Sequence, residues 1–400
     1  MVLQQTYKMQ KVEQHIVKDD RFKDWCVNAK NLYNQMLYYW RQSVFGNIQY
    51  FSEYELVGLM QEYNEENFRS LPANTSQQVI KFLFKNIKSW QKSRKSYIKN
   101  PSNFSGRPKL PKYKKYFSEL YFTSTQVKLK NGFIHFPKMV GIAPMKTNVP
   151  NINCCRVIPK SNHFVVEFIY TVEEKGIQEY NGNWMGIDIG LNNIATCSSN
   201  ITNPFIINGK PLKAINNFYN KRKRVLQSKF GKKITSKRIE RLTFSRNQKI
   251  KDYIHKASRN VIEIAKESNI TKIIIGKNEH WKQSVNLGRN TNRQFTSIPH
   301  ATLIEKIQYK ARLEGIEVVV TQEAYTSKCS AIDLEEICKH ENYVGRRKKR
   351  GLFITAEGKL INADVNGSLN IARLVLGDGI INHDSIRSCL VQPRKIKHFA

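Results

Sequence analysis

The stretch Trp184-Met185-Gly186-Ile187-Asp188-Ile189-Gly190 decides the fold of the C-terminal half of this chain. It is a short apolar run that carries one carboxylate and then meets a glycine, as a buried strand ending in a turn does. Two more short strands are predicted at 195–198 and 205–207, with turn residues between them. Three adjacent strands at this spacing favour an antiparallel meander.

Strand and helix patterns alternate after the meander. We predict a long helical region over 215–268, a strand over 272–275, a helix over 302–314, a strand over 316–321 and a final helix over 364–376. Three hairpin strands followed by strand–helix alternation are typical of an RNase H-like sheet. The C-terminal half is therefore predicted to be an α/β domain of this type.

The N-terminal half has a different organisation. Apolar residues three to four apart predict helices over 22–100, including one from about Gln77 to Tyr97 with Asn74, Thr75 and Ser76 as capping residues. A connector rich in Pro and Gly dipeptides follows, and residues 116–172 show the period of two that strands require. The polar segment 173–182 is predicted to link the two halves.

The charge balance points to a polyanionic partner. The 400 residues include 66 Lys+Arg and 32 Asp+Glu, which gives a net charge of +34 and a pI near 9.9. Residues 81–130 hold 14 Lys+Arg and one acid, Glu119, and residues 221–260 hold 15 against two. A surface that contacts phosphates explains this imbalance better than plain solvation does.

Other features bound the protein's environment. The first 14 residues are polar and show no secretory signal, and no apolar run is long enough to span a bilayer. An odd number of cysteines, seven, is typical of reduced thiols. These observations predict a cytoplasmic protein.

Carboxylates at strand and helix ends are the candidate catalytic residues. Asp188 and Glu323 follow apolar strands, and Asp364 opens the last helix. Taken singly, each has a plain alternative as a turn or capping residue. Together, on so basic a chain, they predict a nuclease site, because carboxylate oxygens suit paired Mg²⁺ ions, with Mn²⁺ as an alternative, about 4 Å apart.

The middle carboxylate stays open between two residues. An RNase H-like site usually draws an acid from the strand at 273–275, but this strand ends in Gly276-Lys277-Asn278. Glu279 lies three residues beyond Gly276, whereas Glu323 ends the next strand. Because neighbouring strands bring their ends together, we favour Glu323.

The ordered motifs resemble those of the TnpB proteins, RNA-guided endonucleases carried by bacterial insertion sequences. The resemblance covers nearly the whole chain. The matching stretches are GIDIGLNNIAT (186–196), YTSKCS (325–330), NADVNGSLNI (362–371), NLYNQ (31–35) and PKLPKY (108–113).

The resemblance implies a helical recognition domain over 22–111, a β-barrel wedge domain over 1–21 and 112–178, and a RuvC-like nuclease domain over 183–400 with a small insertion at about 326–360. It implies a transposon-derived guide RNA, and cutting of matching double-stranded DNA beside a short adjacent motif by Asp188, Glu323 and Asp364. Nucleic-acid contacts are predicted at Thr75, Ser76, Gln77, Gln78, Lys81, Arg94, Lys95, Lys221, Arg222 and Arg224.

The chain departs from the family in its insertion. Many members hold zinc there with two Cys-x-x-Cys pairs, whereas this chain offers Cys329, Cys338 and His340 at irregular spacing, a poor tetrahedral set. We therefore predict that zinc is not bound. The basic run 346–350 would hold this lobe on nucleic acid or would simply be solvated.

Rival functions remain. A nuclease-dead, guide-dependent repressor would keep the binding without the cutting. A compact type V CRISPR effector descends from the same family, and a metal-dependent transposase or resolvase would act without RNA. Whether the protein forms a homodimer is also left open by the sequence.

Overall fold

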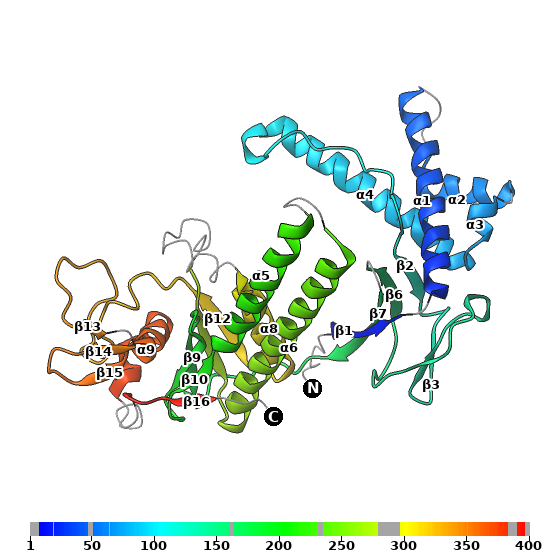
Figure 1. Ribbon diagram of the computed structural model, residues 1–400. Helices are drawn as coiled ribbons and strands as arrows, with labels where there is room; N and C mark the ends of the chain where they lie inside the picture. The colour runs from blue at the N-terminus through cyan, green and yellow to red at the C-terminus, as the bar shows by residue number, and fades with distance from the viewer. Residues whose placement is uncertain are drawn as a thin grey trace. The chain divides into compact units, whose positions relative to one another are not determined.

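The computed structural model describes residues 8–18, 20–46, 51–63, 65–160, 163–230, 235–278, 297–349, 351–382 and 390–396. The chain forms two compact units, which are labelled by their elements in Figure 1. The N-terminal unit holds Lys8–Val172, and the C-terminal unit holds Glu173–Ala400. The boundary lies at the start of the polar segment 173–182.

Helices dominate the first part of the N-terminal unit. Those that the structure describes are α1 (Arg21–Phe45), α2 (Glu53–Glu62), α3 (Glu66–Arg69) and α4 (Ala73–Lys99). α1 buries an apolar stripe from Phe22 to Trp40, and this stripe packs in one core with α4. The predicted helical character of this region is confirmed.

α4 begins earlier than the sequence predicted. The expected start near Gln77, with capping hydroxyls before it, is wrong, because the helix begins at Ala73 directly after Pro72. Proline is tolerated at a helix start, where its missing N–H would have no partner. Thr75 and Ser76 therefore lie inside the first turns, where both are buried.

The strands of the N-terminal unit form two small sheets. The first has the order β1-β7-β6-β2, and the second has the order β3-β4-β5. In the part of the chain that the structure describes, these sheets are not joined into a closed barrel. Their bounds are β1 Lys8–Val17, β2 Leu120–Thr123, β3 Lys128–Lys130, β4 Phe133–His135, β5 Met145–Lys146, β6 Cys154–Pro159 and β7 Phe164–Glu173.

A six-stranded sheet organises the C-terminal unit, with the order β12-β11-β8-β9-β10-β16. β8, β9 and β10 form the predicted antiparallel meander, and β11 and β12 lie parallel to β8 on its other side. The first strand of the meander is therefore central. The bounds are β8 Trp184–Asp188, β9 Asn193–Ser199, β10 Phe205–Asn208, β11 Lys272–Gly276, β12 Glu317–Thr321 and β16 Arg394–Ile396.

Helices cover both faces of this sheet (Figure 1). α6 (Lys237–Glu267) and α8 (His300–Leu313) share one core with the sheet, together with the start of α5 (Lys210–Phe230). α9 (Ala363–Leu376) packs on the opposite face. The long helix-rich region predicted over 215–268 is thus two helices.

Strand alternation determines which side chains meet α9. In β8, Met185 and Ile187 belong to the core with α6 and α8, whereas Trp184 belongs to the core with α9. Side chains alternate faces along a strand, so Asp188 lies on the α9 side. In β11, Ile274 packs toward α9 in the same way, which places Gly276 on that side too.

Smaller elements complete the unit and were not predicted. Between β12 and α9, a three-stranded antiparallel sheet is formed by β13 (Arg346–Lys349), β14 (Leu352–Ile354) and β15 (Leu360–Asn362). β16 pairs in parallel with β10 at the sheet edge. A short 3-10 turn occupies Asp378–Asn382 in this unit, and two others, Pro101–Asn103 and Lys138–Val140, belong to the N-terminal unit.

Candidate carboxylate site

Asp188 is the last residue of β8, and it reaches the N-terminal part of α9. A Cβ placed on Gly367 of α9 would lie 3.0 Å from Asp188 Oδ2. Two residues before Asp188 on β8, a Cβ on Gly186 would overlap the backbone carbonyl of Ser368, the residue after Gly367. Glycine at these two positions therefore allows the helix to lie close against the strand that carries Asp188.

Asp364 lies in the first turn of α9, but it does not cap the helix. The N-cap is Asn362, whose side chain accepts hydrogen bonds from the backbone N–H groups of Asp364 and Val365. The Asp364 carboxylate instead accepts a hydrogen bond of 2.6 Å from Asn193 at the start of β9. It also faces Arg347 of β13, with 3.6 Å between Oδ1 and a guanidinium nitrogen.

Glu323 follows β12 by two residues, and its side chain returns over the end of β11. A Cβ on Gly276 would overlap Glu323 Oε2 and would lie 2.5 Å from Cδ1 of Ile371. The missing side chain at 276 thus creates the space that the Glu323 carboxylate occupies. Asn278 fixes this arrangement, because its amide donates to Glu323 Oε1 and accepts from the Glu323 backbone N–H, both at 3.3 Å.

The three carboxylates influence one another electrostatically. Burial raises the pKa of Asp188 to about 7, and the charge of Asp364 adds to the rise while Arg347 opposes it. Burial raises the pKa of Glu323 to about 8, and the charge of Asp188 adds to it. Carboxyl groups that are close together and poorly hydrated resist ionisation in this way. Asp188 is thus the carboxylate that links the other two, since it is affected by the charge of Asp364 and itself affects Glu323.

The donor set suits a hard cation. Among the described residues, Glu323 Oε2 is buried and has no hydrogen-bond partner. A buried carboxylate oxygen without a partner is costly, and a bound cation would remove that cost. Carboxylate oxygens are the ligands that Mg²⁺ and Mn²⁺ prefer. The alternative acid, Glu279, lies outside the described residues.

Three residues of this site were missed by sequence reasoning. Asn193, Asn278 and Arg347 contact the carboxylates, yet each looks like a turn residue or part of a charged run in the sequence. Asn193 lies within the motif 186–196, which was the one available signal. The other two become recognisable only when neighbouring strands are assembled.

The predicted nucleic-acid contacts divide by burial. Thr75 and Ser76 are fully buried. Ser76 Oγ donates to the Phe68 carbonyl at 2.6 Å, and Thr75 Oγ1 accepts from the Gln126 amide at 3.2 Å. Both hydroxyls are thus used inside the protein, which corrects their assignment as base-reading residues. The remaining candidates are partly or fully exposed: Gln77, Gln78, Lys81, Arg94, Lys95, Lys221, Arg222 and Arg224.

The cysteine region of the insertion forms a compact cluster. Ligand atoms of Cys329, Glu335 and His340 lie within 4.8 Å of one another, and Cys338 Sγ lies 3.3 Å from His340 Nε2. Glu335 was not among the predicted ligands. Its two oxygens accept hydrogen bonds from the backbone N–H groups of Ser330 and Val344. The prediction that this region does not bind zinc stays a prediction.

Comparisons with known proteins agree with the motifs. The OrfB_IS605 family, described as a probable transposase, matches residues 167–282, and the Cas12f1-like TNB domain matches residues 300–371. A TnpB-like protein of Methanocaldococcus jannaschii is 25% identical over 189 residues, or 46% of this chain. These matches agree with the resemblance of the sequence motifs to the TnpB proteins.

A second protein similar to this chain is the CRISPR-associated endodeoxyribonuclease Cas12f2 of a Micrarchaeota archaeon. It is 24% identical over 275 residues, or 64% of this chain. The matched parts amount to 48% of the Cas12f2 protein and 66% of the Methanocaldococcus protein.

The chain also resembles solved structures of RNA-guided nucleases. A Cas12f1–sgRNA–target DNA complex covers 91% of this chain and 98% of its own, with 16% identity and a TM-score of 0.39. The mini-RNA-guided endonuclease Cas_phi3 covers 93% of each chain, with 11% identity and a TM-score of 0.46.

No helix among the described residues has the length and apolar character needed to cross a membrane.

Proposed function

We propose that this protein is an RNA-guided, metal-dependent DNA endonuclease of a transposable element, built on a RuvC-like nuclease domain. The observation that carries the proposal is the position of Asp188, which ends β8 near the middle of the sheet, lies against α9, and is linked electrostatically to both Asp364 and Glu323. The similarity to a TnpB-like protein and to a Cas12f2 endodeoxyribonuclease supports it.

The residues of the site would divide the work. Asp188, Glu323 and Asp364 would hold divalent cations, which supply a reactive water and stabilise the leaving oxygen during phosphodiester hydrolysis. Asn193 holds the carboxylate of Asp364, and Asn278 holds that of Glu323. Fixed carboxylates preserve their geometry during the reaction, so these two amides act as positioning residues.

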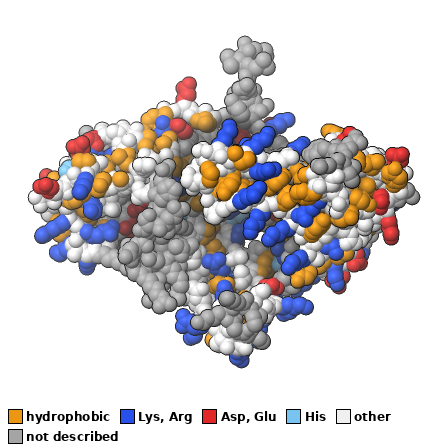
Figure 2. Space-filling view, turned by 90° about the horizontal axis from the view of Figure 1, so that it is seen from above, with side chains coloured by type: hydrophobic (Ala, Val, Ile, Leu, Met, Phe, Trp, Pro, Cys, Tyr) orange, Lys and Arg blue, Asp and Glu red, His pale blue; other side chains and the backbone are white. Residues whose placement is uncertain are grey.

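The basic surface would bind the nucleic acids. Figure 2 shows many Lys and Arg side chains on the face seen from above, and fewer acidic ones. A net charge of +34 neutralises phosphates of a guide RNA and a target DNA without reading their sequence. Base pairing with the guide would then supply most of the sequence choice, the division of labour that the RNA-guided nucleases share. We propose that Gln77, Gln78 and Lys81 contact the duplex beside the target.

A plasmid cleavage assay tests the proposal. The full chain, purified with the RNA that it binds, should cut a plasmid carrying a matching target in Mg²⁺ and should not cut it in EDTA. Sequencing the bound RNA identifies the guide, and treatment with RNase should abolish cutting.

The outcomes separate the rivals. Target binding without cutting at any Mg²⁺ or Mn²⁺ level would identify a guide-dependent repressor. Cutting that resists RNase would identify a nuclease that works without a guide. The Cas12f2 similarity keeps a compact type V effector as the second candidate, and an RNA with CRISPR repeat sequence would favour it.

A further inference from the structure

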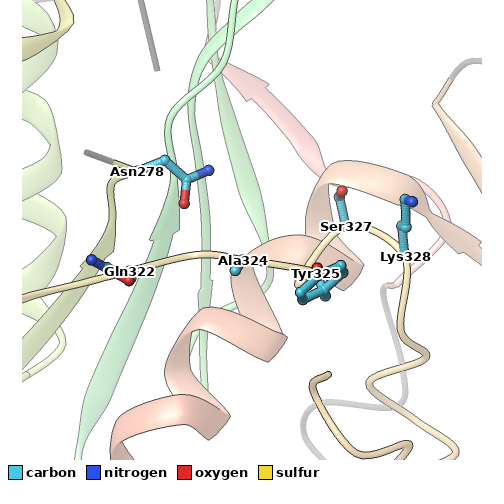
Figure 3. Close-up of a pocket in the computed structure, with 6 residues that line it drawn as sticks. All are labelled: Asn278, Gln322, Ala324, Tyr325, Ser327 and Lys328. Atoms are coloured by element: carbon cyan, nitrogen blue, oxygen red, sulfur yellow. The ribbon is translucent and has the colours of Figure 1, made fainter. Parts of the chain in front are cut away.

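A cavity of about 480 Å³ opens beside the segment that carries Glu323. Figure 3 shows that Asn278 lines it from the end of β11, while its other lining residues come from the chain around and after Glu323. Because the Asn278 amide also donates to Glu323 Oε1, one side chain borders both the cavity and the carboxylate site. The lining residues are Asn278, Gln322, Ala324, Tyr325, Ser327 and Lys328.

The lining chemistry suits a nucleotide. It combines an aromatic ring, two amides, a hydroxyl and an ammonium group, and none of the six residues is acidic. The cavity volume lies within the range of roughly 300–1,000 Å³ that is usual for small-molecule sites. An aromatic ring stacks on a base, amides and hydroxyls bond to base edges or sugars, and an ammonium group meets phosphate.

Tyr325 is held in an unusual conformation. Its φ of +63° lies in the left-handed region, which costs an L-residue of this size about 1 kcal/mol or more. The surrounding turn enforces it: Thr326 Oγ1 donates to the Glu323 carbonyl at 3.0 Å, and Asn370 of α9 donates to the Thr326 carbonyl at 2.9 Å. The Tyr325 side chain stays 38% exposed. These two hydrogen bonds, one of them from α9, thus hold the turn that carries the exposed ring.

Lys328 supplies the positive charge on the same segment. It is exposed, and its ammonium group lies 5.6 Å from the centre of the Tyr343 ring, a contact that orients it without neutralising it. A cation and an exposed ring three residues apart match the two recognition elements of single-stranded nucleic acid, backbone charge and stacking.

We propose that this cavity binds one nucleotide of single-stranded DNA, next to the phosphodiester that is cut at the carboxylate site. The base stacks on Tyr325, and Lys328 meets the backbone. Stacking tolerates any base, as an enzyme whose target is set by its guide requires. The assignment rests on the proposed nuclease function, because that function makes DNA the strand that enters the site.

Two measurements on the full chain with its bound RNA test the subsite. In the first, single-stranded DNA oligomers unrelated to the guide carry 2-aminopurine at successive positions and are mixed with protein in EDTA. The parent should quench the label at one or two positions, and Tyr325→Leu should not. Leucine removes the ring without adding a β-branch at a left-handed position. Tyr54→Leu is the matched control, because Tyr54 is 85% exposed on α2 of the other unit.

The second measurement is the single-turnover rate on matched target DNA in Mg²⁺. Tyr325→Leu should cut about tenfold more slowly, the loss expected when one stacked base is released, while target affinity stays within about twofold. Lys328→Gln, which leaves the turn intact, should weaken the quenching about threefold and reduce its salt dependence.

The results distinguish this subsite from the nuclease proposal. If the parent cuts its target and both variants match it in rate and quenching, the subsite is wrong and the nuclease function stands. If the parent cuts nothing but quenching still depends on Tyr325, the subsite is supported and the nuclease function fails. Quenching seen with RNA oligomers alone would overturn the assignment to DNA.

Discussion

β11 and β12 are parallel neighbours, yet within the described ranges only the chain after β12 supplies a carboxylate to the site. β11 ends in Gly276, which has no side chain, and the chain after β12 supplies Glu323. The Glu323 carboxylate lies in the space that a side chain at 276 would occupy, and Asn278 anchors it there. A carboxylate that is absent from the end of one strand can therefore be supplied by the neighbouring strand, provided that the first strand ends in a residue without a side chain.

The largest effect is expected at Asp188, which lies on β8 and serves the site whichever strand supplies the other carboxylate. Asp188→Asn should reduce the single-turnover cleavage rate by about 1,000-fold, because it removes a charged ligand from the centre of the site. Guide and target affinity should stay near the parental values in filter-binding assays. Cleavage at the parental rate would contradict the site assignment.

Gly276→Ala tests whether the Glu323 carboxylate needs the space at the end of β11. The new methyl group would collide with Glu323 Oε2 and Ile371 Cδ1, so we expect about 100-fold slower cleavage and a loss of about 1–3 kcal/mol in unfolding free energy. Gly106→Ala is the control, since a Cβ there meets nothing within 4 Å. Equal rates for the two variants would show that the space at 276 is not needed.

Asn278→Ala should have a smaller effect, because it frees Glu323 without removing it. Loss of two hydrogen bonds of 3.3 Å should slow cleavage about tenfold and raise the Mg²⁺ concentration needed for half-maximal rate. Titrating the rate against Mg²⁺ separates this positioning role from a general loss of folding. An unchanged Mg²⁺ dependence would argue that Asn278 does not orient Glu323.

The smallest expected effect is a change with pH in the folding stability of the metal-free protein. The pKa values of Asp188 and Glu323 are raised in the folded state to about 7 and about 8, so the folded chain binds more protons than the unfolded chain between about pH 4 and pH 8. These two groups therefore make the fold less stable as pH rises through this window.

Comparing the parent with Asp188→Asn separates the contribution of Asp188 to the pH dependence of stability from that of the many other charged groups. In EDTA, Asp188→Asn should melt a few degrees higher than the parent at pH 8, about the size that 1–2 kcal/mol produces, and within about 1 °C of it at pH 5. Mg²⁺ should narrow the difference at pH 8. A difference that does not change with pH would contradict the shared burial of these carboxylates.

Patterns that repeat along the chain were predictable from the sequence. The meander, the strand at 272–275 and the helix that Asp364 opens follow from hydrophobic period, and the structure contains them. The motifs that carry Asp188 and Asp364 also indicated the elements on which these two residues lie. The distance between Asp188 and Asp364 depends on how α9 packs against β8, and this packing cannot be predicted from the sequence pattern.

Features set by tertiary contact were not predictable. The capping hydroxyls expected before α4 are buried instead, because Pro72 starts the helix earlier. β16 has three residues, too few for a period to be seen, and it exists through its pairing with β10. Gly276 looked like a missing ligand, and only its contact with Glu323 shows what it provides.

The most direct measurement compares Glu323→Gln with Glu279→Gln. Each variant keeps the size of the side chain and removes one charge, so single-turnover cleavage of a matched target in Mg²⁺ reports which carboxylate completes the site. We predict that Glu323→Gln cuts at least about 100-fold more slowly than the parent and that Glu279→Gln cuts at nearly the parental rate. Fast cleavage by Glu323→Gln, with the loss at Glu279→Gln instead, would contradict the account.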